Sequence, residues 1–128
     1  MITVIKSPFV QYKLTILRNK KTSNTVFRQT MNEISYLIAS DVLQYVPFKK
    51  QTIETPLKKM SGTALGQPII LVPILRAGLG LLEGFAKFLP EAEKGHIGLY
   101  RDEQTYEPVE YLFKLPGVTN KKVLILDP

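Results

Sequence analysis

The chain contains no cysteine and only one histidine among its 128 residues. Without cysteine it can form neither a disulfide bond nor a thiolate metal centre. His96 has no second histidine or cysteine to act with, so it cannot head a metal site or a Ser/His/Asp triad of the usual kind, and we interpret it as structural. The sequence therefore predicts no metal site built from its own side chains, and no catalytic nucleophile can be named.

Long apolar segments are also absent. The longest apolar run, Ile69 to Leu75, has seven residues, whereas a membrane-spanning helix needs roughly 18 or more. The N-terminus lacks the basic segment, apolar stretch and cleavage site of a secretory signal. Since 45% of the residues are hydrophobic and 22% are charged, the composition is typical of a globular domain. We expect a single domain over residues 1–128, with the cytoplasm as the default compartment.

Positive charge is concentrated in the N-terminal part of the chain. Residues 1–50 carry eight basic and two acidic side chains and residues 51–128 carry nine of each, so the first part holds the whole net charge of +6. A basic region of this kind fits nucleic acid, an anionic surface or a phosphorylated ligand. A solvated helix face with lysine pairs in turns is the simpler interpretation.

The N-terminal part has a helical pattern. Apolar residues recur at three- and four-residue steps over residues 27–42, which predicts an amphipathic helix with Ser23 or Asn24 at its start. A shorter helix is expected over residues 10–19. We therefore expect residues 1–50 to form a helical N-terminal layer.

The rest of the chain alternates between strand and helix signals. Residues 68–75 are apolar on both faces, which is typical of a buried parallel strand. Residues 79–89 show helical spacing, and two further short strands are expected over residues 97–100 and 123–126. Residues 61–66 have the composition of a turn. This order predicts an α/β fold with a parallel sheet and right-handed crossovers.

Two segments lack a packing partner within the predicted sheet. Residues 101–116 mix charged and apolar side chains at strand spacing, which predicts a projecting β-arm, with a partner subunit the simplest surface for it to bury against. The sequence stops at Asp127 and Pro128, at the tip of a buried-type strand. With about three strands counted, against roughly five or six in a doubly wound domain, we expect the C-terminal part of the domain to be absent from residues 1–128.

Candidate binding residues follow the predicted strands. Ligands of open parallel sheets bind beyond the carboxyl ends of the strands. There Arg76 opens a turn into a helix, with Gly78 and Gly80 allowing close approach of the backbone and the helix N-terminus offering unpaired N–H groups. Arg101 and Asp127 follow the other two strands. We expect the two arginines to hold a polyphosphate from two sides and Asp127 to contact sugar hydroxyls or a metal.

Three segments together resemble the uracil phosphoribosyltransferases, namely residues 72–80, 98–111 and 123–128, and the match spans essentially the whole chain. The resemblance implies a type I phosphoribosyltransferase fold. It also implies the transfer of a phosphoribosyl group from phosphoribosyl pyrophosphate (PRPP) to uracil, which gives UMP and pyrophosphate and usually requires Mg²⁺. The reaction needs fixed cations rather than a covalent nucleophile.

The resemblance also implies residue roles and partners. The implied PRPP-binding residues are Arg76, Ala77, Gly78, Gly80, Arg101 and Asp127. Arg76 to Gly80 would form the pyrophosphate loop, Arg101 would contact the diphosphate, and Asp127 would open the loop for ribose 5-phosphate. The arm at residues 101–116 would serve a homodimer or larger oligomer, and GTP is a possible effector.

Residues 1–128 contain the diphosphate half of such a site and lack the segments that would hold the 5-phosphate and read the uracil. A polypeptide ending at Pro128 is therefore expected to form no UMP. Two alternatives stay open, an RNA-binding regulatory relative that uses the basic N-terminal part, and an inactive truncated product.

Overall fold

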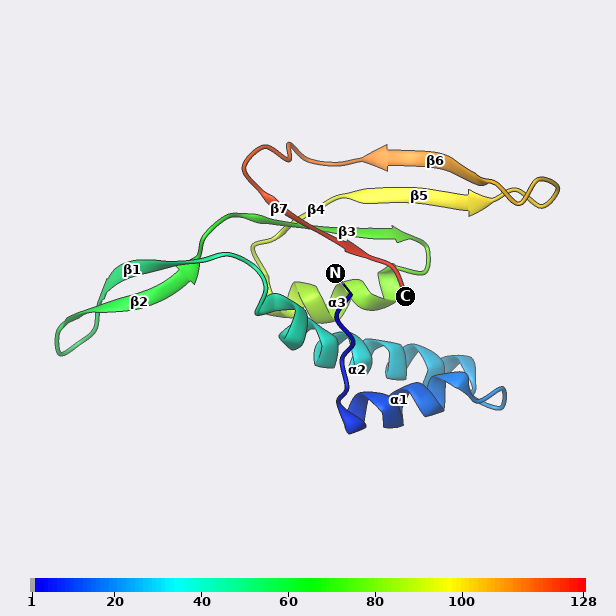
Figure 1. Cartoon of the computed structure of the whole chain (residues 1–128), viewed down its shortest axis with the longest axis horizontal. Helices are drawn as coiled ribbons and strands as arrows, with labels where there is room; N and C mark the ends of the chain where they lie inside the picture. The colour runs from blue at the N-terminus through cyan, green and yellow to red at the C-terminus, as the bar shows by residue number, and fades with distance from the viewer. Residues whose placement is uncertain (1) are drawn as a thin grey trace.

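A computed structural model describes residues 2–128 of the chain (Figure 1). The helices are α1 (Pro8–Arg18), α2 (Asn24–Leu43) and α3 (Leu79–Phe88). The strands are β1 (Phe48–Glu54), β2 (Lys59–Leu65), β3 (Ile69–Leu75), β4 (Glu93–Lys94), β5 (His96–Arg101), β6 (Pro108–Lys114) and β7 (Lys122–Leu126). Among the described residues, no helix has both the length and the hydropathy needed to cross a membrane.

Strand β3 forms the centre of the main sheet, as its apolar sequence predicts. Its first five residues are buried, and it pairs in parallel with β7 on one edge and with β4 and β5 on the other. Strand β6 extends the sheet by pairing antiparallel with β5. Residues 2–128 thus form a five-stranded sheet, larger than the three strands expected, because the two-residue β4 and the arm strand β6 also join it.

Helices α2 and α3 lie where the sequence predicts them, and α1 begins two residues before its predicted start. The Ser23 hydroxyl accepts a hydrogen bond from the Val26 N–H at 3.3 Å and caps α2, as expected for a serine before a helix. Helix α3 packs on β3 and β7, α2 packs on α3, and α1 packs on α2. The α/β fold class is therefore confirmed.

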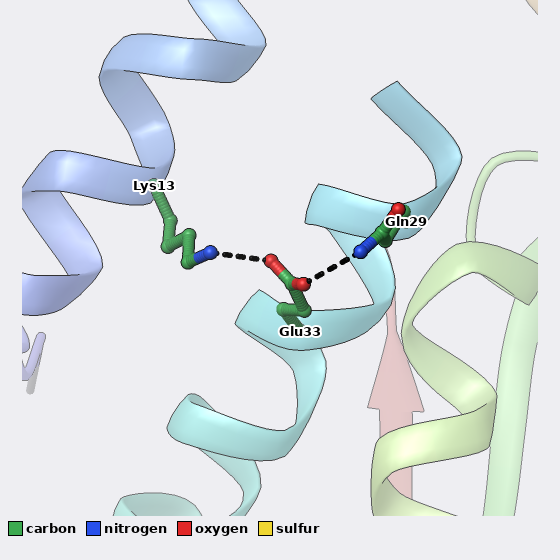
Figure 2. A network of polar contacts seen from close by, with 3 residues as sticks. All are labelled: Lys13, Gln29 and Glu33. Carbon is green, nitrogen blue, oxygen red and sulfur yellow. Dashed lines mark hydrogen bonds and ion pairs between the residues drawn. The ribbon is translucent and has the colours of Figure 1, made fainter. Parts of the chain in front are cut away.

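An ion pair joins the two N-terminal helices (Figure 2). Lys13 Nζ donates to Glu33 Oε2 at 2.6 Å, and Gln29 Nε2 donates to Glu33 Oε1 at 3.2 Å. The hydrogen bond from Lys13 contributes most to lowering the pKa of Glu33, and the bond from Gln29 adds to it. The Lys13–Glu33 contact attaches α1 to α2, and Gln29 holds the Glu33 carboxylate from within α2.

Strands β1 and β2 form an antiparallel hairpin that sequence reasoning missed. The pairing runs from Phe48 opposite Leu65 to Glu54 opposite Lys59, so the turn predicted at residues 61–66 is wrong for residues 61–65, which are strand. The hairpin projects from the body of the chain (Figure 1), and among the described elements its two strands pack only on each other. Both of its faces are therefore largely exposed, and β1 begins within the stretch expected to be a helical layer.

The predicted arm at residues 101–116 is a hairpin at the edge of the sheet. Arg101 ends β5, a turn follows, and β6 pairs with β5 along its length. Asp102 holds the turn by accepting hydrogen bonds from the Gln104 and Thr105 N–H groups at 2.9 and 2.8 Å. The bond from Thr105 and then that from Gln104 lower the pKa of Asp102. Whether this arm meets a partner subunit stays a prediction.

Candidate functional site

The predicted site residues follow the carboxyl ends of three parallel strands. Arg76 follows β3, Asp127 follows β7, and Arg101 is the last residue of β5. All three residues are exposed. The topology therefore places them at one edge of the sheet, where ligands of open α/β sheets bind.

The segment from Arg76 to Gly78 is a tight turn after a cis peptide bond between Leu75 and Arg76. The Gly78 N–H donates to the Ile74 carbonyl at 2.8 Å, and the Leu79 and Gly80 N–H groups donate to turn carbonyls at 3.1 Å. The prediction of unpaired N–H groups at the start of α3 is thus wrong for these residues, because the turn satisfies them. Within residues 2–128, the N–H groups of Arg76 and Ala77 donate to no backbone carbonyl, so they are the amides of this turn that could face an anion.

Gly78 and Gly80 both have close neighbours within the chain. Gly78 is buried, and a Cβ atom on it would overlap the Leu126 carbonyl oxygen and lie 2.6 Å from the Ile74 nitrogen. A Cβ atom on Gly80 would lie 2.8 Å from Met31 Cγ. The two glycines therefore let β7 and α2 approach the turn, and the predicted close approach of a ligand there stays a prediction.

Arg76 lines a hollow of about 560 Å³ between this turn and α2. The turn contributes Ala77, the start of α3 contributes Gly80, Pro128 also lines the hollow, and α2 contributes Arg28 among others. Asp127, next to Pro128 in the chain, lines a neighbouring apolar hollow along β7. The structure thus brings Arg76, Ala77 and Gly80 together around one hollow, and Asp127 lines the neighbouring one.

Arg101 lies apart from this hollow. It lines a separate hollow formed by Tyr100 and residues 102–104. The pairing of β3 with β5 ends at Leu75 opposite Gly98, so Arg76 turns away one residue after the last pair, whereas Arg101 lies three residues after it on β5. The two arginines expected to share a polyphosphate are therefore not brought into one hollow by residues 2–128.

Sequence reasoning missed the residues that α2 contributes. Phe27, Arg28 and Met31 line the Arg76 hollow, although they lie almost 50 positions away in the chain. The helical spacing of these residues predicts the helix, but it does not predict which face of α2 packs against α3. One sequence feature could have pointed to this contribution, namely Arg28, a charged residue that directly follows the apolar Phe27 on that helix.

The lining of the hollow is mainly apolar, with Phe27 and Met31 among its residues, and it also includes two arginines, Arg28 and Arg76. Guanidinium groups bind phosphate oxygens through planar pairs of N–H groups, so these two residues are its candidates for binding an anion. Among the described residues, no three His, Cys, Asp or Glu side chains gather in a way that could hold a metal ion. A metal at this edge would therefore need oxygen ligands from a bound phosphate as well as from Asp127.

Comparisons with known proteins identify the family of the chain. A family model described as uracil phosphoribosyltransferase matches residues 4–128. Uracil phosphoribosyltransferases of Levilactobacillus brevis and Lactiplantibacillus plantarum are 46% identical over 127 residues, which is 98% of this chain and 61% of each relative. The structure of the AQ2163 protein from Aquifex aeolicus superposes with a TM-score of 0.90 at 32% identity, covering 100% of this chain and 62% of that one.

The chain thus spans about three fifths of the length of the relatives that it matches. The match runs through every element from α1 to β7, including the turn at Arg76 and the end of β7. These findings favour the enzyme family over the RNA-binding alternative. The chain belongs to the uracil phosphoribosyltransferase family.

Proposed function

We propose that this chain provides the PRPP-binding part of the uracil phosphoribosyltransferase reaction of pyrimidine salvage, in which uracil and PRPP give UMP and pyrophosphate. The observation that carries the proposal is the family match over residues 4–128 combined with the Arg76 hollow at the carboxyl edge of the sheet. In this proposal residues 1–128 form one domain, and Arg76, Ala77, Gly78 and Gly80 build the turn that receives the diphosphate. Arg101 and Asp127 are proposed to contact PRPP from the neighbouring strands.

The proposed chemistry depends on stabilising charge. The bond between the ribose anomeric carbon and the diphosphate oxygen breaks, the carbon gains oxocarbenium character, and the leaving diphosphate gains negative charge. The hydrogen bonds of the turn hold the backbone of Arg76 and Ala77 in place before the reaction begins, and the Arg76 side chain lines the hollow. Fixed donors of this kind stabilise a developing negative charge without the cost of reorganisation.

Mg²⁺ is proposed to arrive with PRPP. Magnesium prefers oxygen ligands and commonly binds through one or two carboxylates together with substrate phosphates. Asp127 is an exposed carboxylate at the same edge of the sheet, so it fits such a role. The ion would neutralise diphosphate charge when bound. A cytoplasmic location, a homodimer and a GTP effector are further proposals that rest on the resemblance.

Calorimetric titration of the 128-residue chain with PRPP, with and without Mg²⁺, tests the proposal. We expect saturable binding that inorganic pyrophosphate competes away. The matched variant Arg76→Lys keeps the charge but loses the planar pair of donors, so its affinity should fall by about tenfold or more. Absence of PRPP binding at millimolar concentration, or unchanged binding by Arg76→Lys, contradicts the proposed role of this hollow.

A further inference from the structure

The turn between α1 and α2 carries a cluster of cations that the proposed site does not use. Arg18, Lys20 and Lys21 lie close together in the sequence, and all three are exposed. Residues 1–32 contain six basic side chains and no acidic one. Among the described residues, both ion pairs involve other lysines, so the cations of the turn have no carboxylate partner. The turn is therefore an uncompensated source of positive charge.

Hydrogen bonds fix the backbone of this turn. The Thr22 hydroxyl donates to the Ile16 carbonyl at 2.6 Å, and the Thr22 N–H donates to the Asn19 carbonyl at 3.0 Å. The Asn19 side chain accepts a hydrogen bond from the Lys21 N–H at 2.9 Å. Helix α2 follows with no acidic residue in its first turn, so the positive end of its dipole adds to the potential of the lysines.

The turn lies at the same end of the molecule as the carboxyl edge of the main sheet (Figure 1). Met31 on α2 lies against Gly80, at the start of α3, and Ser35 accepts a hydrogen bond from the Gly84 N–H one turn further along both helices. The two helices therefore run in the same direction, and the start of α2 extends past the start of α3. Since α2 begins seven residues before Met31, or about 10 Å along its axis, the cations lie roughly 10–20 Å from the Arg76 turn.

Acidic side chains border the same edge on its other side. The turn between β5 and β6 carries Asp102, Glu103 and Glu107. Asp127 after β7 and Glu83 on α3 add negative charge at the edge itself. An anion that approaches the edge is therefore repelled from the side of the β5–β6 turn and attracted from the side of the α1–α2 turn.

We infer that the α1–α2 turn draws PRPP and other polyphosphates to the carboxyl edge of the sheet by long-range electrostatic attraction. This inference rests on the proposed function, from which it takes the ligand, and it adds the side from which the ligand arrives. Arg18, Lys20 and Lys21 act before the ligand is bound and make no contact with it afterwards. They raise the rate constant for association and leave the rate constant for dissociation, which depends on contacts in the site, unchanged.

Inorganic pyrophosphate is the probe for a test on the 128-residue chain. Phosphorus NMR line shapes, combined with the affinity from calorimetry, give both rate constants. At an ionic strength of 0.01 M, where the Debye length is about 30 Å, Lys20→Gln combined with Lys21→Gln should lower the association rate constant by about tenfold. At 0.1 M, where that length is about 10 Å, the decrease should be less than about threefold. The dissociation rate constant should change by less than about twofold at both ionic strengths.

A second double variant removes the same charge from the opposite edge of the sheet. Lys94 and Lys122 are exposed, and they pair with Leu71 and Ile69 near the start of β3. Lys94→Gln combined with Lys122→Gln should lower the association rate constant by about threefold at most at 0.01 M, because these lysines lie further from the Arg76 turn. Equal unfolding midpoints in urea for the two double variants and the unmodified chain exclude misfolding as the cause.

Three results would overturn the inference. Equal decreases in the two double variants would show an effect of net charge without direction, and an effect on dissociation alone would show direct contact with the bound ligand. An association rate constant that is unchanged at 0.01 M would remove the turn from ligand capture. The proposed function survives each of these results if Arg76→Lys still weakens pyrophosphate binding. Failure of the unmodified chain to bind pyrophosphate at millimolar concentration would remove the proposed diphosphate site, and the inference with it.

Discussion

Gly78 lets the Arg76 turn pack closely against the end of β7. It is buried between the Leu126 carbonyl and the backbone of Ile74, where there is no room for a side chain. Its backbone is helical, with φ −60° and ψ −19°, so the requirement for glycine comes from packing and not from an unusual conformation. The residue therefore fixes the distance between the two strand ends from which Arg76 and Asp127 extend.

Replacing Gly78 with alanine should destabilise the fold. The added methyl group would force backbone atoms of β3 or β7 to move, and overpacking of this kind costs roughly 1–3 kcal/mol. Gly117→Ala is the matched control, because no atom lies within 4 Å of the position that its Cβ would occupy. Urea unfolding should show a lower midpoint for Gly78→Ala and a change below about 0.5 kcal/mol for Gly117→Ala. Equal midpoints for the two variants would contradict the packing argument.

The sequence could predict part of this site and not the rest. A buried strand followed by Arg76, and another followed by Asp127, were enough to place these residues at one edge of the sheet. The reason for Gly78 and the presence of Arg28 depend on contacts between segments that lie almost 50 residues apart. Such contacts follow from how strands and helices pack, which no local pattern of residues encodes.

Helix α1 depends on one ion pair for much of its polar attachment to α2. Lys13 reaches Glu33 while its Nζ atom also lies 5.5 Å from the ring centres of Phe9 and Tyr12, so the lysine is held on two sides. The pKa of Glu33 is lowered mainly by the hydrogen bond from Lys13. A carboxylate whose pKa is lower in the folded state than in the unfolded state stabilises the fold at pH values above its unfolded-state pKa. This stabilisation is lost as the pH falls through the folded-state pKa.

Glu33→Gln should therefore reduce stability at neutral pH and lose its effect in acid. We expect the unmodified chain to unfold at a higher urea concentration than Glu33→Gln at pH 7, with the difference shrinking below about pH 4, near the ordinary pKa of a glutamate. Glu103→Gln, in the turn before β6, serves as the control for the loss of one negative charge. A difference that persists unchanged down to pH 3, or one that Glu103→Gln reproduces, would show that the Glu33 charge does not attach α1.

Elements buried on one face or on both could be predicted, and the exposed hairpin could not. Helix α2 shows apolar residues on one face, and β3 is apolar throughout because both of its faces are covered. Strands β1 and β2 are mostly exposed on both faces, so polar and apolar residues do not alternate along them. Without alternation, small and polar residues at positions 61–65 are as typical of a turn as of a strand.

In the whole molecule, the β1–β2 hairpin is a second candidate, beside the arm at residues 101–116, for a contact with a second copy of the chain. Leu57 at its tip is 95% exposed, and Phe48, Ile53 and Met60 are between 41% and 52% exposed. The arm at residues 101–116 also exposes apolar side chains, with Tyr106, Tyr111 and Phe113 between 55% and 70% exposed. Exposed apolar side chains on an element that packs on nothing else in the described chain are typical of an oligomer interface.

Leu57→Ser should weaken the proposed homodimer. Sedimentation equilibrium of the 128-residue chain should show a dissociation constant raised by about tenfold, as expected for one buried leucine moved to solvent. Tyr106→Ser, which removes an exposed side chain from the turn between β5 and β6, is the matched comparison. A dimer weakened only by Tyr106→Ser would assign the interface to residues 101–116. A chain that is monomeric at all concentrations would contradict an interface at either hairpin.

PRPP binding and UMP formation can be measured separately on the 128-residue chain. Transfer to uracil requires the base to be held against the anomeric carbon at about 3 Å, which depends on groups that fix its orientation. The curated relatives are matched over 61% of their length, and the matched part contains the Arg76 hollow. We expect the 128-residue chain to bind PRPP and to form no UMP from uracil, while the Levilactobacillus brevis relative, assayed in parallel, serves as the positive control. UMP formation by the 128-residue chain that is abolished by Arg76→Ala would show that residues 1–128 also hold the base.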